Sequence, residues 1–408
     1  MLFLFFVFCC TINGNPLKLR WLEAENGDEF TDSWHQHHAL VRQSYFSNLT
    51  SDLHRRRMVT GKLNARLGGL MVEVSIAGEP FPVIVNAKSS DFWISGKDAS
   101  APNDSSDLHA QRKKIDPSSP ALTDSGMRVR MWYGGKDVSV SVYRGEIGFA
   151  SKSRPNQPFG VSTLQRADIG IASGVLGIGP FSGECTICKD THGTPVIRSL
   201  GFQQINLYVP ESSSEDGELS FGNPNHIRYT GAFKWEPSDS AKLWSFKLSS
   251  VYVSGHPETE ASLSVVIDLR AIGISLPKAI ADVLANNVGA TETSHKDTYK
   301  IDCADKHTGK PLFIQSASGH TYTVPPAAYV VPMDDNTCRF AVVANTEENE
   351  TNILGKSFLQ NLYTRFDNKE GRIGFANAVH MCCIPLDDGC CAPDCECCQG
   401  IELGSCHK

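Results

Sequence analysis

The sequence has no excess of positive charge and few long apolar runs. Its 38 Lys and Arg residues are outnumbered by 45 Asp and Glu residues, for a net charge of -7, which argues against a nucleic-acid partner. No run of 18 apolar residues follows the N-terminus, so we expect no membrane attachment in the later chain. Gly-x-Ser-x-Gly, His-Glu-x-x-His and glycine-rich phosphate-binding motifs are also absent. The usual signals of serine hydrolases, zinc proteases and nucleotide-binding proteins are therefore missing.

Length and composition are those of a globular protein. A chain of 408 residues exceeds what one hydrophobic core usually serves, so we expect two large domains. Apolar residues make up 41% and charged residues 20%, close to ordinary values and far from those of disordered chains. Eight of the 14 cysteines follow residue 381, which separates a cysteine-rich tail, residues 381–408, from the rest.

The first 14 residues begin with an apolar stretch that is too short to span a bilayer. The stretch predicts a secretory signal peptide, with an interfacial anchor as the alternative because no basic residues precede it. We therefore expect a secreted, extracellular protein with no membrane attachment after signal removal. Disulfide bonds form readily in that compartment.

Residues 15–66 have mixed charge and lack the strand pattern that follows. They contain four histidines and the run Arg55-Arg56-Arg57. Histidines that become charged at acid pH, together with this basic run as a processing site, favour a pro-segment that lies against a more acidic body. A solvated linker is the alternative. We do not predict a metal site on the histidines.

From residue 67 the chain alternates between strands and turns. Residues 70–76 and 81–85 predict a hairpin, and residues 138–142, 243–248, 251–253, 320–324 and 328–331 predict further strands. Helical periodicity is confined to short stretches such as residues 278–285. The chain is therefore predicted to be all-β.

Two blocks lying 182 residues apart indicate an internal repeat. Val85-Asn86-Ala87 and Ile267-Asp268-Leu269 each end an apolar run in a short turn. A glycine-rich apolar segment follows each block, because Gly177 lies 91 residues after Asn86 and Gly355 lies 87 residues after Asp268. The similar spacing predicts a duplicated unit and two related lobes.

In their order along the chain, these motifs resemble those of the pepsin-like aspartic proteases. The resemblance covers residues 67–380 and rests on the hairpin that leads to Asn86-Ala87-Lys88-Ser89-Ser90, the flap-like Trp132-Tyr133-Gly134-Gly135, Gly174 to Gly179, Glu218 to Gly222, Asp268 to Pro277, Asn352 to Phe358 and Arg372 to Ala376. It implies a bilobal all-β fold around a central cleft, with an N-terminal lobe at residues 67–236 and a C-terminal lobe at residues 237–380. A peptide or protein ligand in the cleft is the implied partner.

The resemblance places Asn86 and Asp268 at the two catalytic positions of the family. Active members have two aspartates about 3 Å apart that share one proton, one activating a water and the other donating to the peptide oxygen. An amide hydrogen-bonds but does not exchange a proton at any relevant pH. Asn86 is therefore expected to orient a water without activating it.

The neighbours of both positions also differ from the family pattern. Ala87 and Leu269 stand where active members have hydroxyl residues, and Lys88 and Arg270 stand where they have glycines. Since only glycine enters some backbone conformations freely, we expect these two side chains to distort the turns. Further along the chain, Lys356 ends the motif that is Ile-Leu-Gly-Asp in the family.

Three residues of the implied substrate groove are kept. Tyr133 matches the flap tyrosine, Trp93 its aromatic partner, and Ser89 the serine that bonds the first aspartate. Such residues fit a cleft that binds extended peptides by strand addition. Burial in a β lobe explains the two aromatics equally well, with Ser89 as a turn residue. Asp91 is a weak candidate for a substitute carboxylate.

The cysteines predict disulfide bonds. Cys185 and Cys188 have redox spacing, but in a polar loop of a secreted protein they favour a local disulfide. Cys303 and Cys338 resemble the single disulfide of the family's second lobe. The cysteines of the tail favour a knot of disulfides, with a thiolate metal cluster as the alternative. Sequons at Asn48, Asn103 and Asn349 are typical of a glycoprotein.

Two main functions remain open at the level of sequence, beside a third in which the cysteine-rich tail is the functional part and the lobes carry it. One is a catalytically impaired or inactive homologue of the pepsin-like endopeptidases that still binds peptides, and the other is an active secreted acid endopeptidase. The altered dyad favours the first. We expect no cofactor, no metal in the lobes, and a monomer.

Overall fold

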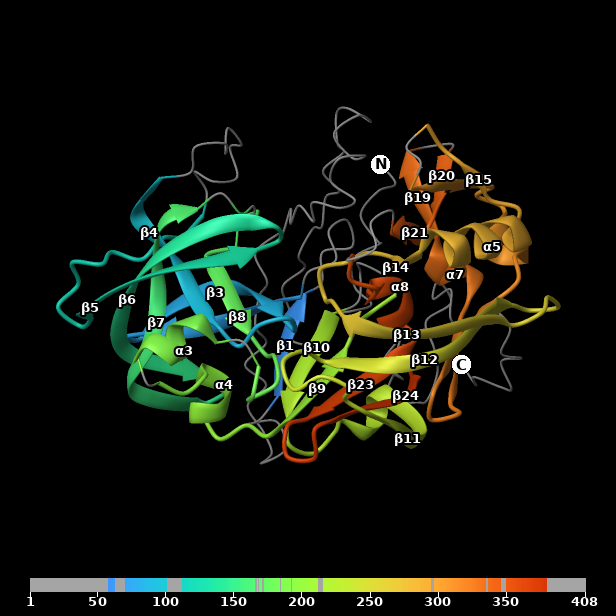
Figure 1. The fold of residues 1–408 in the computed structure, drawn as a ribbon. Coiled ribbons are helices and arrows are strands. Elements are labelled where there is room, and N and C mark those ends of the chain that lie inside the picture. Colours follow the sequence, from blue (N-terminus) through green and yellow to red (C-terminus); the bar gives the residue numbers. More distant parts are fainter. Residues whose placement is uncertain are drawn as a thin grey trace, which may run out of the picture.

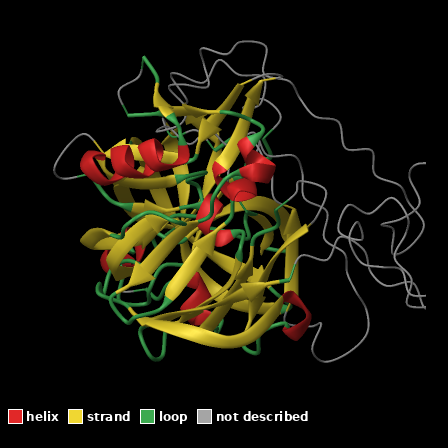
Figure 2. Cartoon of the chain, turned by 90° about the vertical axis from the view of Figure 1, so that its right-hand side faces the viewer, coloured by secondary structure: helices red, strands yellow, loops and turns green. Residues whose placement is uncertain are grey.

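The computed structural model describes residues 58–62, 70–100 and 112–379, apart from residues 166, 168, 171, 184, 192, 212–215, 295–296, 335–336 and 346–349. The predicted signal peptide, the cysteine-rich tail, the asparagines of the three sequons and most of the predicted pro-segment lie outside these residues. Strands dominate the described chain and the helices are short (Figures 1 and 2). The all-β prediction is confirmed.

The N-terminal lobe is built on a seven-stranded sheet in the order β2-β3-β8-β4-β7-β6-β5 (Figure 1). Its strands are β2 Met71–Ile76, β3 Glu79–Asn86, β4 Phe92–Ser100, β5 Thr123–Tyr133, β6 Lys136–Phe149, β7 Lys152–Gln165 and β8 Gly174–Gly177, followed by the helices α3 Thr186–Thr191 and α4 Val196–Ser199. The predicted β2–β3 hairpin is present. Its turn, Ala77-Gly78, has φ angles of 51° and 85°, the sign that a two-residue hairpin turn with matching twist requires.

The C-terminal lobe contains a seven-stranded sheet in the order β18-β17-β12-β13-β22-β14-β21 and a four-stranded sheet in the order β15-β16-β20-β19. The strands are β12 Ser245–Val253, β13 Thr259–Ile267, β14 Ile274–Pro277, β15 Thr291–Glu292, β16 Tyr299–Ile301, β17 Leu312–Ser316, β18 Thr321–Val324, β19 Val330–Asp334, β20 Thr337–Phe340, β21 Val342–Asn345 and β22 Ile353–Leu354. The helices are α5 Lys278–Val288, α6 Asp305–Thr308, α7 Pro326–Tyr329 and α8 Lys356–Leu359. None of the described helices is long and apolar enough to cross a membrane.

Helix α5 confirms the predicted helix at residues 278–285 and continues to Val288. Ala281, Leu284 and Ala285 form its buried face, which is the spacing of an amphipathic helix. Gly289, at φ 79°, ends it because its N–H returns to carbonyls of the last turn. The strand predicted at residues 328–331 is partly wrong. Residues 328 and 329 belong to α7, which begins at Pro326, a residue favoured in the first helical turn.

A six-stranded sheet joins the two halves in the order β1-β10-β9-β23-β24-β11 (Figure 1). Its strands are β1 Met58–Lys62, β9 Gln204–Tyr208, β10 Asp216–Phe221, β11 Tyr229–Pro237, β23 Leu362–Asp367 and β24 Arg372–Ala378, and the 3-10 helix η2 His226–Arg228 precedes β11. The pairing of β9 with β23 connects the halves. The predicted lobe boundary at residue 236 falls within β11, and β1 falls within the predicted pro-segment; both boundaries stay predictions.

The internal repeat is visible in the strand pairing. Strand β3 pairs in parallel with β8, and β4 pairs antiparallel with β8. In the second half β13 pairs in parallel with β22, and β14 pairs antiparallel with β22. Gly177 and Gly355 take the same place in these units, because a Cβ atom would collide with the carbonyl oxygen of Ser89 at the first and of Ala271 at the second. Each glycine therefore lets a strand end lie against the neighbouring turn.

Candidate functional site

The first turn of the site begins at Asn86, the last residue of β3. Its side chain is buried, and Oδ1 accepts a hydrogen bond from the backbone N–H of Lys88 at 3.1 Å. The carbonyl of Asn86 accepts from the N–H of Ile178, which ties the turn to the end of β8. An Asn side chain that bonds the backbone two residues ahead is a stable local turn.

The second turn repeats this geometry. Asp268 follows β13, is almost fully buried, and accepts a hydrogen bond from the N–H of Arg270 at 2.9 Å through Oδ1. Its own N–H donates to the carbonyl of Leu354 in β22. The carboxylate and the amide therefore occupy equivalent positions in the two lobes.

A side chain from the first turn reaches the second. The ammonium of Lys88 lies 3.4 Å from Oδ2 of Asp268, and the Lys88 side chain is 37% exposed while that of Asp268 is 3% exposed. The structure thus brings Lys88 and Asp268 together from opposite lobes, and Asn86 lies in the same turn as Lys88. An ammonium at this distance stabilises the ionised form of a buried carboxylate.

Arg270 extends from the second turn to the hairpin of β5 and β6. Its guanidinium carbon lies 4.1 Å from the centre of the Tyr133 ring, a cation–π contact. The next residue, Gly134, has a φ of 57°, and a Cβ atom there would lie 2.6 Å from Nη2 of Arg270. A side chain at position 134 would be strained at this φ and would require the Arg270 guanidinium to move. The tip of the β5–β6 hairpin of the N-terminal lobe therefore contacts Arg270 of the C-terminal lobe.

The comparisons with known proteins agree with this architecture. The model of the family described as eukaryotic aspartyl protease matches residues 71–378. This chain belongs to that family. It is 27% identical to Candidapepsin-2 of Candida parapsilosis over 84% of each chain, and 28% identical to Secreted aspartic protease 8 of Candida albicans over 73% of this chain and 72% of the relative. It is also 23% identical to Probable vacuolar protease A of Arthroderma benhamiae over 75% of this chain and 78% of the relative.

Family membership confirms the resemblance predicted from sequence and the bilobal fold. The expected distortion of the two turns stays a prediction. Positive φ angles among the described non-glycine residues occur at Ala77, Ala150, Ser151 and Asn156, and so at neither Lys88 nor Arg270. At both positions the backbone conformation is one that any residue adopts. The effect of the two side chains on this aspartyl protease homologue is therefore one of charge and volume, not of strain from a positive φ angle.

Ala87 and Leu269 follow the two dyad positions, and both are buried in the main hydrophobic core. Burial of each aliphatic side chain stabilises the folded protein by about 25 cal/mol per Å² of apolar surface removed from water. The turns are thus held by local hydrogen bonds and apolar burial.

Tyr133 and Trp93 contact each other as the sequence predicts. Their ring centroids lie 5.9 Å apart in an edge-to-face arrangement, and both rings are buried in a second apolar cluster that includes Met131 and Val175. This contact satisfies both interpretations made from sequence, a flap pair and a core pair. A substrate-binding role stays a prediction.

The hydroxyl of Ser89 is directed to Asp91. It accepts from the N–H of Asp91 at 2.9 Å and donates to Oδ2 at 3.3 Å. The other oxygen of Asp91 accepts from the N–H of Ile187 in α3. Burial raises the pKa of Asp91 although these hydrogen bonds act to lower it. Asp91 therefore anchors α3 to the turn, which explains the carboxylate without a catalytic role.

Lys356 lies immediately behind the second turn. Its backbone N–H donates to the carbonyl of Ala271 at 2.7 Å, and its side chain is buried. Burial lowers the pKa of Lys356 to about 8, because the charged form is penalised in an apolar environment. Among the described residues no carboxylate lies within ion-pair distance of this ammonium.

Both disulfides predicted within the described residues are formed, Cys185–Cys188 and Cys303–Cys338. The first lies at the start of α3, and the second links the segment after β16 to β20. No cluster of potential metal ligands occurs among the described residues.

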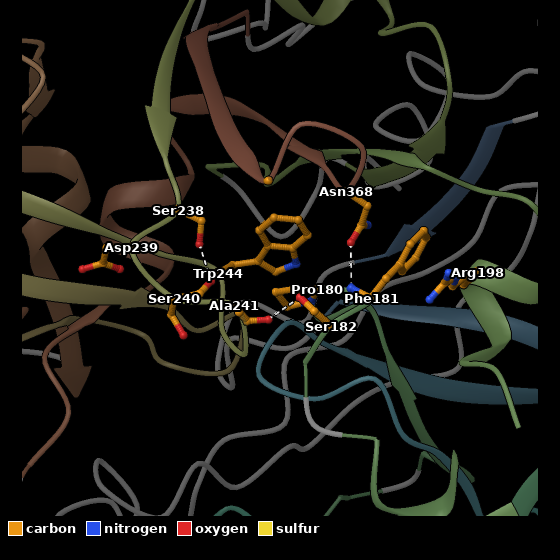
Figure 3. Close-up of a pocket in the computed structure, with 11 residues that line it drawn as sticks. Pro180, Phe181, Ser182, Arg198, Ser238, Asp239, Ser240, Ala241, Trp244 and Asn368 are labelled. Atoms are coloured by element: carbon orange, nitrogen blue, oxygen red, sulfur yellow. Dashed lines mark hydrogen bonds between the residues drawn. The ribbon is translucent and has the colours of Figure 1, made fainter. Parts of the chain in front are cut away.

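A cavity of about 520 Å³ lies at a different junction between the two halves (Figure 3). Its lining includes Phe181 from the first half and Trp244 and Asn368 from the second. Oδ1 of Asn368 accepts from the N–H of Phe181, and the indole N–H of Trp244 donates to the carbonyl of Ile178. Neither Asn86 nor Asp268 lines this cavity, so it is separate from the candidate site.

Proposed function

We propose that this protein is a non-catalytic member of the eukaryotic aspartyl protease family that binds extended peptide segments in the cleft between its lobes. The observation that carries the proposal is the ion pair of Lys88 with Asp268 beside the amide of Asn86. Active members of the family need two carboxylates that exchange a proton during turnover.

The charges at the two turns argue against that exchange. Asn86 neither takes up nor releases a proton in the relevant pH range. Asp268 forms an ion pair with the ammonium of Lys88, so a cation lies where the second carboxylate of an active centre would act on it. Among the described residues, the two turns therefore offer one carboxylate, an amide in place of the second, and a cation where active members have a glycine.

Peptide binding is supported by the parts of the site that do not take part in proton transfer. The family binds peptide substrates in its cleft. Strand addition uses backbone hydrogen bonds and pockets for alternate side chains, and neither needs the second carboxylate. Tyr133 and Trp93 keep the paired arrangement predicted for a flap.

A binding measurement tests the proposal. Isothermal titration of the mature protein with extended eight-residue peptides and with a hydroxyl-bearing transition-state mimic is expected to show peptide binding. Tyr133→Leu is expected to weaken that binding about 10-fold, a loss of about 1.4 kcal/mol. Trp132→Leu is the matched control because Trp132 is 69% exposed on the opposite face of the same hairpin. Absence of binding to every ligand would reject the proposal.

The competing function is an active acid endopeptidase. Family membership favours it, as do the names of the relatives, two of which are called proteases. Proteolysis of an unfolded protein substrate separates the two functions.

We further propose export from the cell, because the N-terminal segment predicts a signal peptide and one relative is named a secreted protease. The vacuolar relative makes an internal compartment of the secretory route the alternative. Removal of a pro-segment, glycosylation at the sequons and a monomeric state belong to the same proposal.

A further inference from the structure

The disulfide of Cys185 and Cys188 encloses two residues that contact the first turn of the candidate site. Its cysteines are three residues apart, so Thr186 and Ile187 lie inside the closed ring. The backbone N–H of Ile187 donates to Oδ1 of Asp91 at 2.9 Å, and the same carboxylate accepts hydrogen bonds from Thr186. Both residues inside the ring therefore hold the carboxylate of Asp91.

Asp91 connects this ring to the turn that begins at Asn86. Its carboxylate accepts from the hydroxyl of Ser89, and its N–H donates to the same hydroxyl. Its carbonyl accepts from the N–H of Gly177 at the end of β8. Asp91 is buried, so the loss of hydrogen bonds to its carboxylate would leave a buried group without partners and destabilise the turn.

The side chain of Ile187 makes a second connection. It is buried in the second apolar cluster, which also contains Trp93 and Tyr133. It packs against β7, because a Cβ atom at Gly160 would lie 3.0 Å from Cδ1 of Ile187. One residue of the ring therefore contacts the first turn through its backbone and the cluster around the Trp93–Tyr133 pair through its side chain.

The local structure around this disulfide depends on the cross-link. Helix α3 comprises six residues, and a helix this short is not stable by itself in water. A disulfide that closes so small a ring constrains the unfolded chain little, so it acts mainly on the local arrangement of α3. Cys185 is buried, whereas Cys188 is partly exposed. The sulfur of Cys188 is therefore the one that an incoming thiolate reaches.

We propose that the Cys185–Cys188 disulfide is a redox switch that holds the first turn and the Trp93–Tyr133 pair in the arrangement that binds peptides. This inference rests on the proposed peptide-binding function. The oxidised form is the binding form. Reduction frees the loop, so that α3 no longer fixes Asp91 and the apolar cluster. Peptide affinity then falls, because part of the binding free energy is used to order this wall of the groove.

The reductant is a dithiol, either of a protein or of a small molecule. One of its thiolates attacks Sγ of Cys188 and forms a mixed disulfide, while the sulfur of Cys185 leaves as a thiolate and takes up a proton. The second thiolate of the reductant then displaces the sulfur of Cys188, which also takes up a proton. The reductant loses two electrons and becomes a disulfide, and the protein gains two thiols.

A first experiment measures which disulfide opens. The purified protein is equilibrated with increasing ratios of reduced to oxidised dithiothreitol, its thiols are alkylated, and the alkylated cysteines are mapped by mass spectrometry. Cys185–Cys188 is expected to open at ratios at which Cys303–Cys338 stays closed. The second disulfide is the internal control, because it joins residues 35 apart in the other lobe. Opening of Cys185–Cys188 only together with Cys303–Cys338 overturns the inference.

A second experiment measures peptide affinity at the ratio that opens only Cys185–Cys188. Fluorescence anisotropy with a labelled eight-residue peptide rich in Val and Phe is expected to show binding at least about fivefold weaker than to the oxidised protein. The double variant Cys185→Ala and Cys188→Ala is expected to bind at the weaker level in both buffers. It keeps the cysteines of the tail and so separates their response from that of the switch. Equal affinity of the oxidised and reduced protein, or an equal response in the variant, overturns the inference.

Hydrogen–deuterium exchange separates the inference from the function on which it rests. Reduction is expected to raise exchange in residues 86–95 and 129–138 and to leave residues 312–324 of the other lobe unchanged. Absence of peptide binding by both forms rejects the proposed function, and a rise in exchange would then still support redox control of this wall. Unchanged exchange in residues 86–95 and 129–138 rejects the switch, whether or not peptides bind.

Discussion

The ammonium of Lys88 forms an ion pair with the carboxylate of Asp268 and joins two turns that lie in different lobes. The turns share the same local hydrogen bond, from the N–H of the second residue ahead to the side chain of Asn86 or Asp268. Lys88 occupies the first of the two positions at which the sequence departs from a glycine. The presence of Lys88 at a position of glycine in the family therefore both introduces a cation and provides a contact between the two lobes.

This ion pair is expected to contribute measurably to stability. In a double-mutant cycle of Lys88→Met and Asp268→Asn, urea unfolding should give a coupling energy of about 1 kcal/mol. This is the upper end of the range for exposed ion pairs, because Asp268 is buried while Lys88 is partly exposed. The exposed pair of Lys97 and Asp116 is the control, and its cycle should give no measurable coupling. A cycle that gives no coupling for Lys88 and Asp268 would contradict the role assigned to the pair.

Restoring the missing carboxylate is not expected to restore proteolysis. Asn86→Asp would add a second carboxylate to the turn that carries Lys88, whose ammonium already forms an ion pair with Asp268, and a nearby cation opposes the sharing of one proton between two carboxylates. Cleavage by Asn86→Asp should stay at the background of Asp268→Ala. Adding Lys88→Gly and Arg270→Gly to Asn86→Asp removes both cations, so this triple variant is the first in which we expect cleavage to appear. Full activity of the single variant would show that the two cations do not matter.

Lys356 is expected to reduce the stability of the protein at neutral pH. Its folded-state pKa of about 8 lies below the ordinary value of 10.5, so the cost is fully present below pH 8 and disappears as the pH rises towards 10.5. The shift corresponds to at most about 3 kcal/mol. Lys356→Met should therefore unfold at higher urea concentration than the unmodified protein at pH 6–7, and the difference should narrow between pH 8 and 10.

Lys247 provides the matched control for this comparison, since it is an exposed lysine on a strand of the same lobe. Lys247→Met should change stability little and equally at all of these pH values. The prediction is contradicted if Lys356→Met is less stable than the unmodified protein, or if its gain in stability is the same at every pH. Either result would show that burial of the Lys356 ammonium does not destabilise the fold.

The mature N-terminus is expected to lie at or before Met58. Strand β1 pairs with β10 over five residues, from Met58 opposite Ser220 to Lys62 opposite Asp216. Removal of the chain up to residue 66 would leave the edge of β10 without this partner, and unpaired edges promote association. The run Arg55-Arg56-Arg57 immediately precedes β1 and fits processing there. N-terminal sequencing of the exported protein tests this, and a terminus after Lys62 would contradict it.

The sequence predicts much of this fold because its signals are local or repeated. The alternation on either side of Ala77-Gly78 predicts the first hairpin, and the similar spacing from Asn86 to Gly177 and from Asp268 to Gly355 predicts the two related units. Residues 328 and 329 were expected in a strand but are helical, because Pro326 favours the start of a helix. The apolar alternation over residues 328–331 is short, and over so few residues it does not distinguish a strand from a helix.

The contacts of the candidate site were harder to predict. Lys88 and Asp268 are 180 residues apart, and only the approach of the two lobes brings the ammonium to the carboxylate. The stacking of Arg270 on Tyr133 likewise depends on where the hairpin tip lies. Replacement of glycine by Lys and Arg suggested strained turns, but strain depends on the φ angle at each position, and the sequence does not give that angle.

The most direct test of the account is whether the mature protein cleaves an unfolded protein substrate between pH 2 and 7, measured beside Asp268→Ala prepared in the same way. Because Asn86 cannot exchange a proton and Asp268 is paired with Lys88, we predict equal and negligible cleavage by both proteins at every pH. Cleavage by the unmodified protein that is abolished in Asp268→Ala would contradict the account and identify an active aspartic endopeptidase.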